Sequence, residues 1–576
     1  MSEQRDLAGS TAARRWRTTT LAPGTETPDA LGAYPRLSTA QLTALAALGE
    51  RRAVQPGDVL FAEGDRNCDF LAVLAGMVAV VEGRGTPQEQ VISVHGRGRF
   101  LGELGLLTGQ AAFYSAVAVL AGEVLAVPAD RLRELVARDA AFGDLILRAC
   151  LIRRSLLIGL GVGVRIVGSR YSADARRLRD FAARNRIPYR WLDLEADPGA
   201  EQLLTQLGVA PQDTPIVILY GRQLLRNPSN AELAGVIGLP APASAEISCG
   251  LLVVGSGPAG LSAAVYAASE GLETMVVDGV ATGGQAGTSA RIENYLGFPS
   301  GISGGELADR ALIQARKFGA RFAVPAEARS IRRDDGRYTV GLGDGTSVTA
   351  DSVVVATGAR HRRLDVPRLA HFEKMSIYYA ASQAEALLCA DDPVAIVGGG
   401  NSAGQAAFFL SRHAARVTLI SRERDLAEHM SWYLIDQVER LANVTVIRHA
   451  QVRELLGDDG LEGIVIADDE TGARQVLRAK AMFVFIGMAP CTGWLGELAE
   501  LDEHGFLRTG HDSGQAACSA ADGQPSWGRS ALETSQPGLY AAGDVRSGSA
   551  KRVATAVGEG EGAMVIRLAF ERMHWA

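Results

Sequence analysis

Three glycines with the spacing GxGxxG follow a short apolar run near the middle of the chain. Gly255, Gly257 and Gly260 come directly after Leu251–Val254, and a run rich in small residues follows them. This order predicts a strand, a tight turn and a helix, which together are typical of a dinucleotide site. The first glycine permits the turn, the second lets the backbone approach a pyrophosphate, and the third lets the helix pack close to the sheet.

An acid stands at the end of the next strand-like run. Asp278 follows Gly260 by 278 − 260 = 18 residues. This is about the separation at which a carboxylate accepts a hydrogen bond from a ribose hydroxyl. We therefore predict that Asp278 binds the ribose of the nucleotide held at this turn.

A second glycine pattern lies further along, within Val394–Arg424. Gly398, Gly400 and Ala403 have the spacing GxGxxA, and the end of the strand after them carries Ser421, Arg422 and Arg424 in place of an acid. An arginine there can bind a 2′-phosphate, which favours NADPH over NADH. Two nucleotide sites, the second nested inside the first, predict a flavin enzyme that a reduced nicotinamide supplies with electrons, and FAD as its cofactor.

Composition excludes several classes of protein. The 576 residues are enough for several domains, and a net charge of −7 with interspersed signs argues against nucleic acid as a partner. We expect no membrane span and no secretion signal. The six cysteines are scattered without a CxxC pair, so a cytoplasmic protein without a metal site is expected.

The elements that must position these residues fall into several predicted domains. We expect a mobile tail over residues 1–35, followed by many short strands with glycine-rich turns over 36–158, which indicate a small β-roll. Residues 160–240 alternate strand and helix patterns, which predicts a small α/β domain. Pro240–Ser244 has the composition of a linker.

The roll resembles a cyclic nucleotide-binding domain. The resemblance is carried by Pro56–Asp58, Glu63–Asp65 and above all Phe100–Leu104. It implies that Glu103 takes the ribose hydroxyl of a bound nucleotide. The arginine that the family uses for the cyclic phosphate is missing from Gln110–Ala116. We therefore expect the fold, with a vestigial or repurposed pocket, and retain a bound nucleotide as the alternative.

The α/β domain resembles thioredoxin and glutaredoxin. Thr214-Pro215 stands where that family places a cis-proline, but Ser169–Ser172 occupies the turn where its CxxC should lie. Thiol exchange needs a thiolate, so we predict a scaffold or docking domain instead of a redox domain.

The C-terminal half closely resembles low-molecular-weight thioredoxin reductase over residues 247–576. GSGPAG, GGQ, ATGA, GGGNSA and AAGDV occur in the order of that family. The resemblance implies two Rossmann-like domains, one for FAD over 246–366 and 490–576 and one for NAD(P)H over 367–489, in a homodimer. The implied cofactor-binding residues are Gly255, Gly257, Pro258, Ala259, Gly260, Asp278, Gly284, Gln285, Asn294, Thr357, Gly358, Gly543, Asp544, Lys551, Arg552 and Val553 for FAD, and Gly400, Asn401, Ser402, Ser421 and Arg422 for NADPH.

This half also departs from the family. Its redox CxxC would fall near Ala380 and Gln383, where no cysteine stands, and Cys389 is interpreted as a buried structural residue. Further arginines for the 2′-phosphate are absent, since Glu423 and Ala427 occupy such positions, so NADH remains open. The family's disulfide reduction is therefore not expected.

Two tyrosines replace the lost sulfur pair as candidate catalytic residues. Tyr378 and Tyr379 either cover the flavin or stack on a substrate, or they fill the volume of the missing disulfide. We predict an FAD-dependent NAD(P)H oxidoreductase that passes electrons to a small-molecule or protein acceptor other than a disulfide. The alternatives are a redox or nucleotide sensor with a regulatory N-terminal domain, and a flavin oxidase acting on a specialised metabolite.

Overall fold

The computed structural model describes residues 25–574, apart from residues 30, 67, 87–88, 103–109, 222, 240–245, 290, 374, 382–384, 387–388, 459 and 511–530. These residues form two compact units. The first contains residues 1–358, 492–500 and 507–576, and the second contains residues 359–491 and 501–506. The predicted linker Pro240–Ser244 lies outside the described residues.

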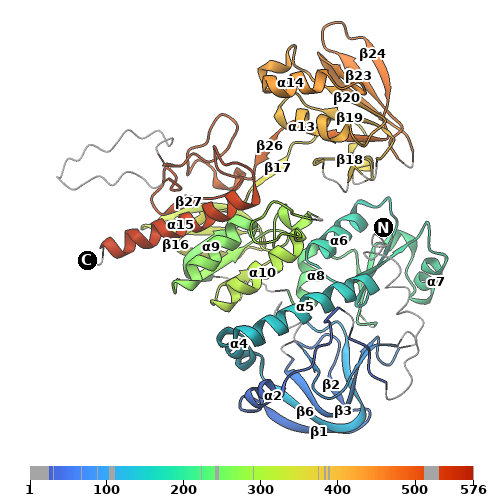
Figure 1. Ribbon diagram of the computed structural model, residues 1–576, viewed down its shortest axis with the longest axis vertical. Coiled ribbons are helices and arrows are strands. Elements are labelled where there is room, and N and C mark those ends of the chain that lie inside the picture. Colours follow the sequence, from blue (N-terminus) through green and yellow to red (C-terminus); the bar gives the residue numbers. More distant parts are fainter. Residues whose placement is uncertain are drawn as a thin grey trace. The chain divides into compact units, whose positions relative to one another are not determined.

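The N-terminal part of the first unit is an antiparallel β-roll (Figure 1). Its long strands β3 and β6 pair along most of their length, because both carry runs of buried apolar residues. The sheet has the order β1-β6-β3-β4, with β2 on β6 and β5 on β3. Its elements are α2 (Thr39–Ala46), β1 (Glu50–Val54), β2 (Val59–Phe61), β3 (Phe70–Glu82), β4 (Gln90–His95), β5 (Phe100–Leu101), β6 (Ser115–Val127), α4 (Ala129–Arg138) and α5 (Ala140–Leu160).

The end of the predicted tail packs on this roll. Thr27 and Ala33 are fully buried, and the Thr27 N–H donates to the Val94 carbonyl at 3.0 Å. Arg99 Nη1 in turn donates to the Thr27 carbonyl at 2.6 Å. The expectation of a tail extending to residue 35 is therefore wrong for this end of it, because polar side chains of the roll hold the backbone of the segment.

The next segment is an α/β unit that shares its core with the roll. Phe113 and Val124 of the roll belong to the same buried cluster as Ile166 and Phe181. The sheet has the order β10-β9-β7-β8, and the Thr214–Pro215 bond is cis, as predicted. The elements are β7 (Val164–Gly168), α6 (Ala173–Arg184), β8 (Tyr189–Asp193), α7 (Pro198–Gln206), β9 (Ile216–Leu219), β10 (Gln223–Arg226) and α8 (Asn230–Val236).

The rest of the first unit is built on a sheet that is parallel at its centre. Val253 in β11 lies opposite Val276 in β12 and Val354 in β16, all fully buried, which is typical of a sheet covered on both faces. The order is β13-β12-β11-β16-β15-β14, with β27 on β16. The elements are β11 (Glu246–Val254), α9 (Pro258–Ser269), β12 (Thr274–Val277), α10 (Gly304–Lys317), β13 (Arg321–Ala323), β14 (Ala328–Asp334), β15 (Arg337–Leu342), β16 (Ser347–Val355), β27 (Leu539–Ala541) and α15 (Val553–His574).

The second unit contains another parallel sheet, of order β18-β25-β19-β20-β21, together with the antiparallel sheet β22-β23-β24. It begins at Ala359 instead of residue 367, because β17 pairs with β26. Its elements are β17 (Ala359–His361), α11 (Leu369–Phe372), β18 (Ile377–Tyr378), β19 (Pro393–Val397), α13 (Asn401–Leu410), β20 (Arg416–Ile420), α14 (Trp432–Glu439), β21 (Val444–Ile447), β22 (Ala450–Leu456), β23 (Gly463–Asp468), β24 (Arg474–Arg478), β25 (Ala481–Val484) and β26 (Met488–Pro490).

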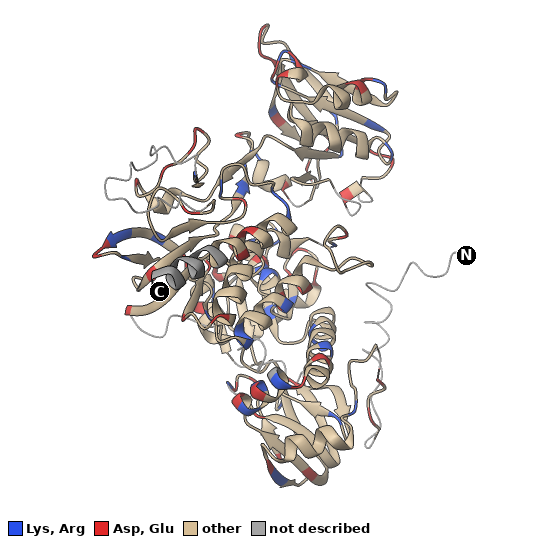
Figure 2. Ribbon diagram, turned by 60° about the vertical axis from the view of Figure 1, so that its left-hand side comes forward, with Lys and Arg blue, Asp and Glu red and all other residues tan. Residues whose placement is uncertain are grey.

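Charges of both signs are interspersed over each unit (Figure 2), in agreement with the composition. Within the described residues, no helix is both long and apolar enough to span a bilayer.

Candidate functional site: two glycine turns

The first glycine turn joins β11 to α9 in a conformation that requires glycine. Gly255 has φ +106°, and a Cβ atom there would lie 2.3 Å from the carbonyl oxygen of Ala356. Gly257, at the start of α9, instead has open space, since a Cβ there would come no closer than 3.8 Å to Gly284. The turn therefore presents bare backbone at the N-terminus of a helix, which is the arrangement that binds a pyrophosphate.

The third glycine sets the distance between α9 and the sheet. A Cβ atom on Gly260 would lie 1.8 Å from the carbonyl oxygen of Gly255. On its other side α9 packs closely against α15, where a Cβ on Gly560 would lie 2.1 Å from the Ala259 carbonyl. Ser262 Oγ donates to the Val557 carbonyl of α15 at 2.8 Å. The helix is thus held from both sides at backbone contact distance.

A second loop of glycines lies against the first turn. The Gly283 N–H donates to the Ser256 carbonyl at 2.8 Å, and Gly284 has φ +55°. A Cβ on Gly284 would lie 3.0 Å from the Cα of Gly257. Gln285, which follows, is exposed. Gly257 and Gly284 thus bring bare backbone of the two loops together, as the predicted binding of the FAD phosphates requires.

The Asp278 carboxylate holds the first glycine turn together. Its Oδ2 accepts hydrogen bonds from the N–H and the hydroxyl of Ser256, at 2.8 and 2.9 Å. Its Oδ1 accepts from the N–H groups of Val280 and Ala281, at 2.9 and 3.2 Å. A carboxylate has about four acceptor positions, and these four bonds occupy them. These bonds tie Asp278 to its own turn, and the ribose contact predicted for it remains a prediction.

The other residues predicted to bind FAD lie on three further segments. Thr357 and Gly358 follow β16, Gly543 and Asp544 follow β27, and Lys551 Nζ donates to the Asp544 carbonyl at 2.9 Å. The remaining ones are half-buried or exposed: Val553 begins α15, Arg552 precedes it, and Asn294 lies on a loop of the first unit. FAD contacts from these residues remain a prediction.

Sequence reasoning missed Glu559 on α15. Its carboxylate is 9% exposed, accepts from the Gly543 N–H at 2.7 Å and pairs with Arg546 at 2.7 Å. It therefore ties the loop after β27 to α15. The sequence signal that could have identified Glu559 is the presence of an acid within the glycine-rich Gly558–Gly562 run. A solvent-facing side chain was the simpler interpretation of that acid.

The second glycine turn, between β19 and α13, repeats the first. Gly398 has φ +144°, and a Cβ there would lie 2.3 Å from the Phe485 carbonyl. Gly400 is open, with its nearest atom, the His429 carbonyl oxygen, at 3.7 Å from an added Cβ. Asn401 and Ser402 start α13 and are exposed, and Asn401 Oδ1 accepts from the Ser431 N–H at 2.7 Å. This turn also fits a dinucleotide.

The groups expected to bind a 2′-phosphate already have a carboxylate as partner. Ser421 Oγ donates to Glu423 Oε2 at 2.6 Å, and Arg422 Nε donates to Glu423 Oε1 at 2.9 Å. Burial raises the pKa of Glu423, but hydrogen bonds from Ser421 and Arg422 outweigh it and bring that pKa below its usual value. Glu423 is therefore an anion at neutral pH.

The two candidate catalytic tyrosines bond within the second unit. Tyr378 OH donates to the Met375 carbonyl at 3.0 Å, and Tyr379 OH donates to Glu373 at 2.6 Å. Glu373 also pairs with Arg363. Burial, followed by the bond to Glu373, raises the pKa of Tyr379 to about 12, so this phenol is neutral at physiological pH. These contacts favour a bracing role, and a catalytic role remains a prediction.

No sulfur pair lies among the described residues. Ala380 is exposed, and Gln383 lies outside the described residues. Cys389 is 2% exposed, its Sγ donates to the Glu385 carbonyl at 3.2 Å, and burial raises its pKa, as expected of a structural thiol. The predicted nucleotide contact Glu103 also lies outside the described residues.

Each of the two turns has the geometry that fits a dinucleotide, and comparisons with known proteins show the family of the chain. Residues 250–560, more than half of the chain, match the family described as pyridine nucleotide-disulphide oxidoreductase. The chain therefore belongs to this family, and its residues 51–139 match the cyclic nucleotide-binding domain. The thioredoxin reductase-like members of the family use FAD and NADPH.

Individual relatives match the C-terminal half. Thioredoxin reductase of Treponema pallidum is 33% identical over 315 residues, which are 55% of this chain and 94% of that protein. A 34.2 kDa protein in the rubredoxin operon of Clostridium pasteurianum is 31% identical, over 54% of this chain and 93% of that protein. Among solved structures, thioredoxin reductase of T. acidophilum is 30% identical with a TM-score of 0.44, covering 56% of this chain and 99% of that one.

Proposed function

We propose that this chain oxidises NADH or NADPH through bound FAD and passes the electrons to an acceptor other than a disulfide. The observation that carries the proposal is the contrast between two intact glycine turns and the missing sulfur pair. Bound FAD would supply the chemistry, accepting a hydride from the nicotinamide and releasing two electrons to the acceptor. Gly257, Gly284 and the N-terminus of α9 would hold its pyrophosphate.

The family's route through sulfur lacks its two cysteines in this chain. The family's pair would fall near Ala380 and Gln383, and the segment Ser376–Gln383 contains no cysteine. Cys389 follows in the sequence, but its raised pKa disfavours the thiolate that disulfide exchange requires. Electrons must therefore leave toward a small molecule or a protein that accepts them directly.

The test is anaerobic mixing of the FAD-loaded full-length protein with NADH or NADPH, followed by an acceptor. We expect bleaching of the flavin absorbance, then reoxidation by ferricyanide or a quinone but not by thioredoxin or an aromatic disulfide. Iodoacetamide treatment and Cys389→Ser should leave the rates unchanged. Rapid disulfide turnover that iodoacetamide abolishes would contradict the proposal.

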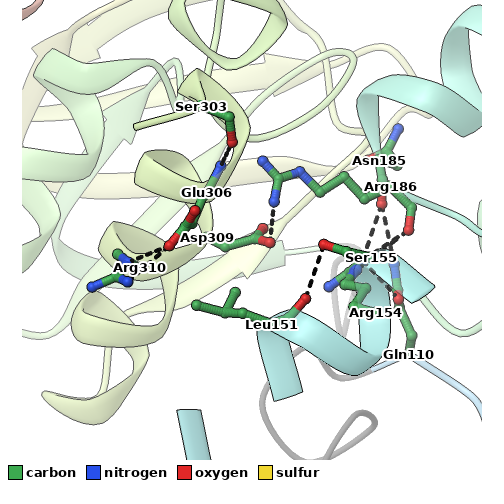
Figure 3. A network of polar contacts seen from close by, with 10 residues as sticks. All are labelled: Gln110, Leu151, Arg154, Ser155, Asn185, Arg186, Ser303, Glu306, Asp309 and Arg310. Carbon is green, nitrogen blue, oxygen red and sulfur yellow. Dashed lines mark hydrogen bonds and ion pairs between the residues drawn. The ribbon is translucent and has the colours of Figure 1, made fainter. Parts of the chain in front are cut away.

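A second candidate function, a sensor, is favoured by a polar network between the N-terminal modules and the flavin domain (Figure 3). Arg154 of α5 is buried, and its Nη2 donates to Gln110 Oε1 at 3.0 Å and to the Arg186 carbonyl at 3.2 Å. Arg186 itself pairs with Asp309 of α10. Gln110 begins the segment Gln110–Ala116, from which the arginine for a cyclic phosphate is missing, so the network joins that segment to the flavin domain.

The same network reaches the loop after Asp278. Asn185 Nδ2 donates to the Val280 carbonyl at 3.0 Å, and the adjacent Val280 N–H is one of the groups that donate to Asp278. Beside these contacts, α4 and α5 face α9 and α10 across a groove of about 1250 Å³. A change in the N-terminal module thus has a direct path to the first glycine turn.

The sensor hypothesis predicts that the ion pair between Arg186 and Asp309 controls the rate of flavin reduction. Arg186→Gln should change the reduction rate several-fold, whereas Arg310→Gln, which removes an exposed pair with Glu306 on the same helix, should not. Added cyclic nucleotide should have an effect in the parent protein that Arg186→Gln removes. Equal rates in all three proteins, with and without nucleotide, would exclude the sensor.

A further inference from the structure

The carboxylate of Glu423 lies directly on the second glycine turn. A Cβ atom built on Gly399, the middle residue of that turn, would lie 2.6 Å from Glu423 Oε2 and 2.7 Å from Ser421 Oγ. The Glu423 side chain is 12% exposed, and its own N–H donates to Ser421 Oγ at 3.2 Å. The carboxylate is therefore held against the backbone that faces a bound dinucleotide.

An acid at this place discriminates between the two nicotinamide nucleotides. In dinucleotide folds, a carboxylate about 20 residues beyond the glycines accepts a hydrogen bond from the 2′-hydroxyl of the adenosine ribose. Glu423 follows Ala403 by 423 − 403 = 20 residues. Because NADPH carries a phosphate in place of that hydroxyl, the same carboxylate would face its negative charge and repel it.

The neighbouring arginines do not reverse this preference, because each already has an acidic partner. Arg422 is 75% exposed and is bonded to Glu423, while Arg424 pairs with Glu470. A 2′-phosphate would have to compete with Glu423 for Arg422 while lying next to the same carboxylate. A ribose with two free hydroxyls meets no such conflict.

We propose that the second glycine turn selects NADH over NADPH, with Glu423 as the specificity-determining residue that accepts a hydrogen bond from the ribose 2′-hydroxyl. This inference rests on the proposed function, since it names the reductant of the same site. It departs from the NADPH that the thioredoxin reductase-like family uses, and it follows from Glu423 and its two bonded neighbours.

Calorimetric titration of the full-length, FAD-loaded protein with NAD⁺ and NADP⁺ tests the proposal without any hydride transfer. We expect NAD⁺ to bind at least about 10-fold more tightly than NADP⁺, the size of one hydrogen bond to a charged group. Glu423→Gln, which keeps an acceptor for Ser421, should weaken NAD⁺ binding several-fold and strengthen NADP⁺ binding by a similar factor. The steady-state ratio of kcat/KM for NADH and NADPH should shift in parallel.

Two further variants test whether the Glu423 carboxylate itself causes the preference for NAD⁺. Glu454→Gln changes the net charge by the same amount by removing an exposed pair with Arg474, but it leaves Glu423 and both neighbouring arginines as they are, so the ratio of the two dissociation constants should stay unchanged. The double variant Glu423→Gln with Arg422→Gln should keep only the part of the gain in NADP⁺ binding that comes from the removed repulsion, because the other part depends on the released Arg422. Thermal melting of each variant confirms that it folds.

Two results would overturn the inference while leaving the proposed function intact. One is equal or tighter binding of NADP⁺ in the parent protein, and the other is an unchanged ratio in Glu423→Gln. Failure of either nucleotide to bind, together with failure of NADH and NADPH to bleach the flavin, would instead overturn the proposed function as well.

Discussion

The two glycine turns share the constraint at their first glycine and differ at the position that packs the helix. At Gly255 and at Gly398 an added Cβ would lie 2.3 Å from a carbonyl oxygen of a neighbouring strand end. At the packing position, Gly260 has no room for a Cβ atom, whereas Ala403 carries one and is fully buried. The first helix therefore lies closer to its turn than the second.

The acids beyond the two turns differ as well. Asp278 is drawn into its own turn by donors from Ser256, Val280 and Ala281, whereas Glu423 accepts from Ser421 and Arg422 and lies on the turn at Gly399. Similar spacing from the glycines thus leads to a structural carboxylate in one turn and a candidate ligand-binding carboxylate in the other. Spacing alone does not assign the role of an acid; its bonded neighbours do.

The largest effect is expected from exchanging the residues at the packing position. Gly260→Ala should lower the free energy of unfolding of the flavin part by about 3 kcal/mol, because backbone must move to admit a methyl group. Ala403→Gly should cost only about 1 kcal/mol, through helix propensity. Urea unfolding followed by flavin fluorescence and circular dichroism measures both. Equal losses would show that the two helices pack alike.

The next largest difference in unfolding free energy is expected between the two acids. Asp278→Asn removes acceptor positions that hold both sides of the first turn, and we expect a loss of about 2 kcal/mol in unfolding free energy. Glu423→Gln should cost about 0.5 kcal/mol, since glutamine still accepts from Ser421. The same urea titrations give both values, and a larger loss in the second turn would reverse the roles assigned to the two acids.

Gly257→Ala should affect binding without affecting folding. The added Cβ has 3.8 Å of clearance in the protein but projects where the pyrophosphate approaches the backbone. We expect a roughly 10-fold weaker affinity for FAD, about 1.4 kcal/mol, with an unfolding midpoint of the apoprotein unchanged. Gly255→Ala serves as the contrast, since it should lower that midpoint. Unchanged FAD affinity in Gly257→Ala would show that the cradle does not hold the cofactor.

A modest effect on stability is expected at Tyr379, which neither turn requires. Tyr379→Phe should cost about 1 kcal/mol through the lost bond to Glu373 and should leave the rate of flavin reduction unchanged. Because the folded pKa of about 12 lies above the usual value of 10, unfolded Tyr379 loses its proton first, and the parent loses stability as pH rises from 10 to 12. The Tyr379→Phe variant should lose less stability than the parent between pH 10 and 12. A reduction rate more than 10-fold lower would restore the catalytic hypothesis.

Much of this architecture could be predicted because it depends on short-range patterns. The glycine spacing located both turns, the apolar runs located the strands on which they stand, and the cis bond before Pro215 followed from its context. The missing sulfur pair was visible as well, because the absence of cysteine from Ser376–Gln383 is a property of the chain itself.

The sequence by itself thus determined where nucleotides are expected and that no thiol relay stands between residues 376 and 383. Only the tertiary structure decided that Asp278 is already satisfied, that Glu423 lies on its turn, that Glu559 supports the loop at Gly543 and that Tyr379 braces Glu373. The reason is physical. A glycine turn is specified by the backbone angles of a few adjacent residues, whereas a carboxylate or a phenol turns toward whichever donors and acceptors folding brings to it.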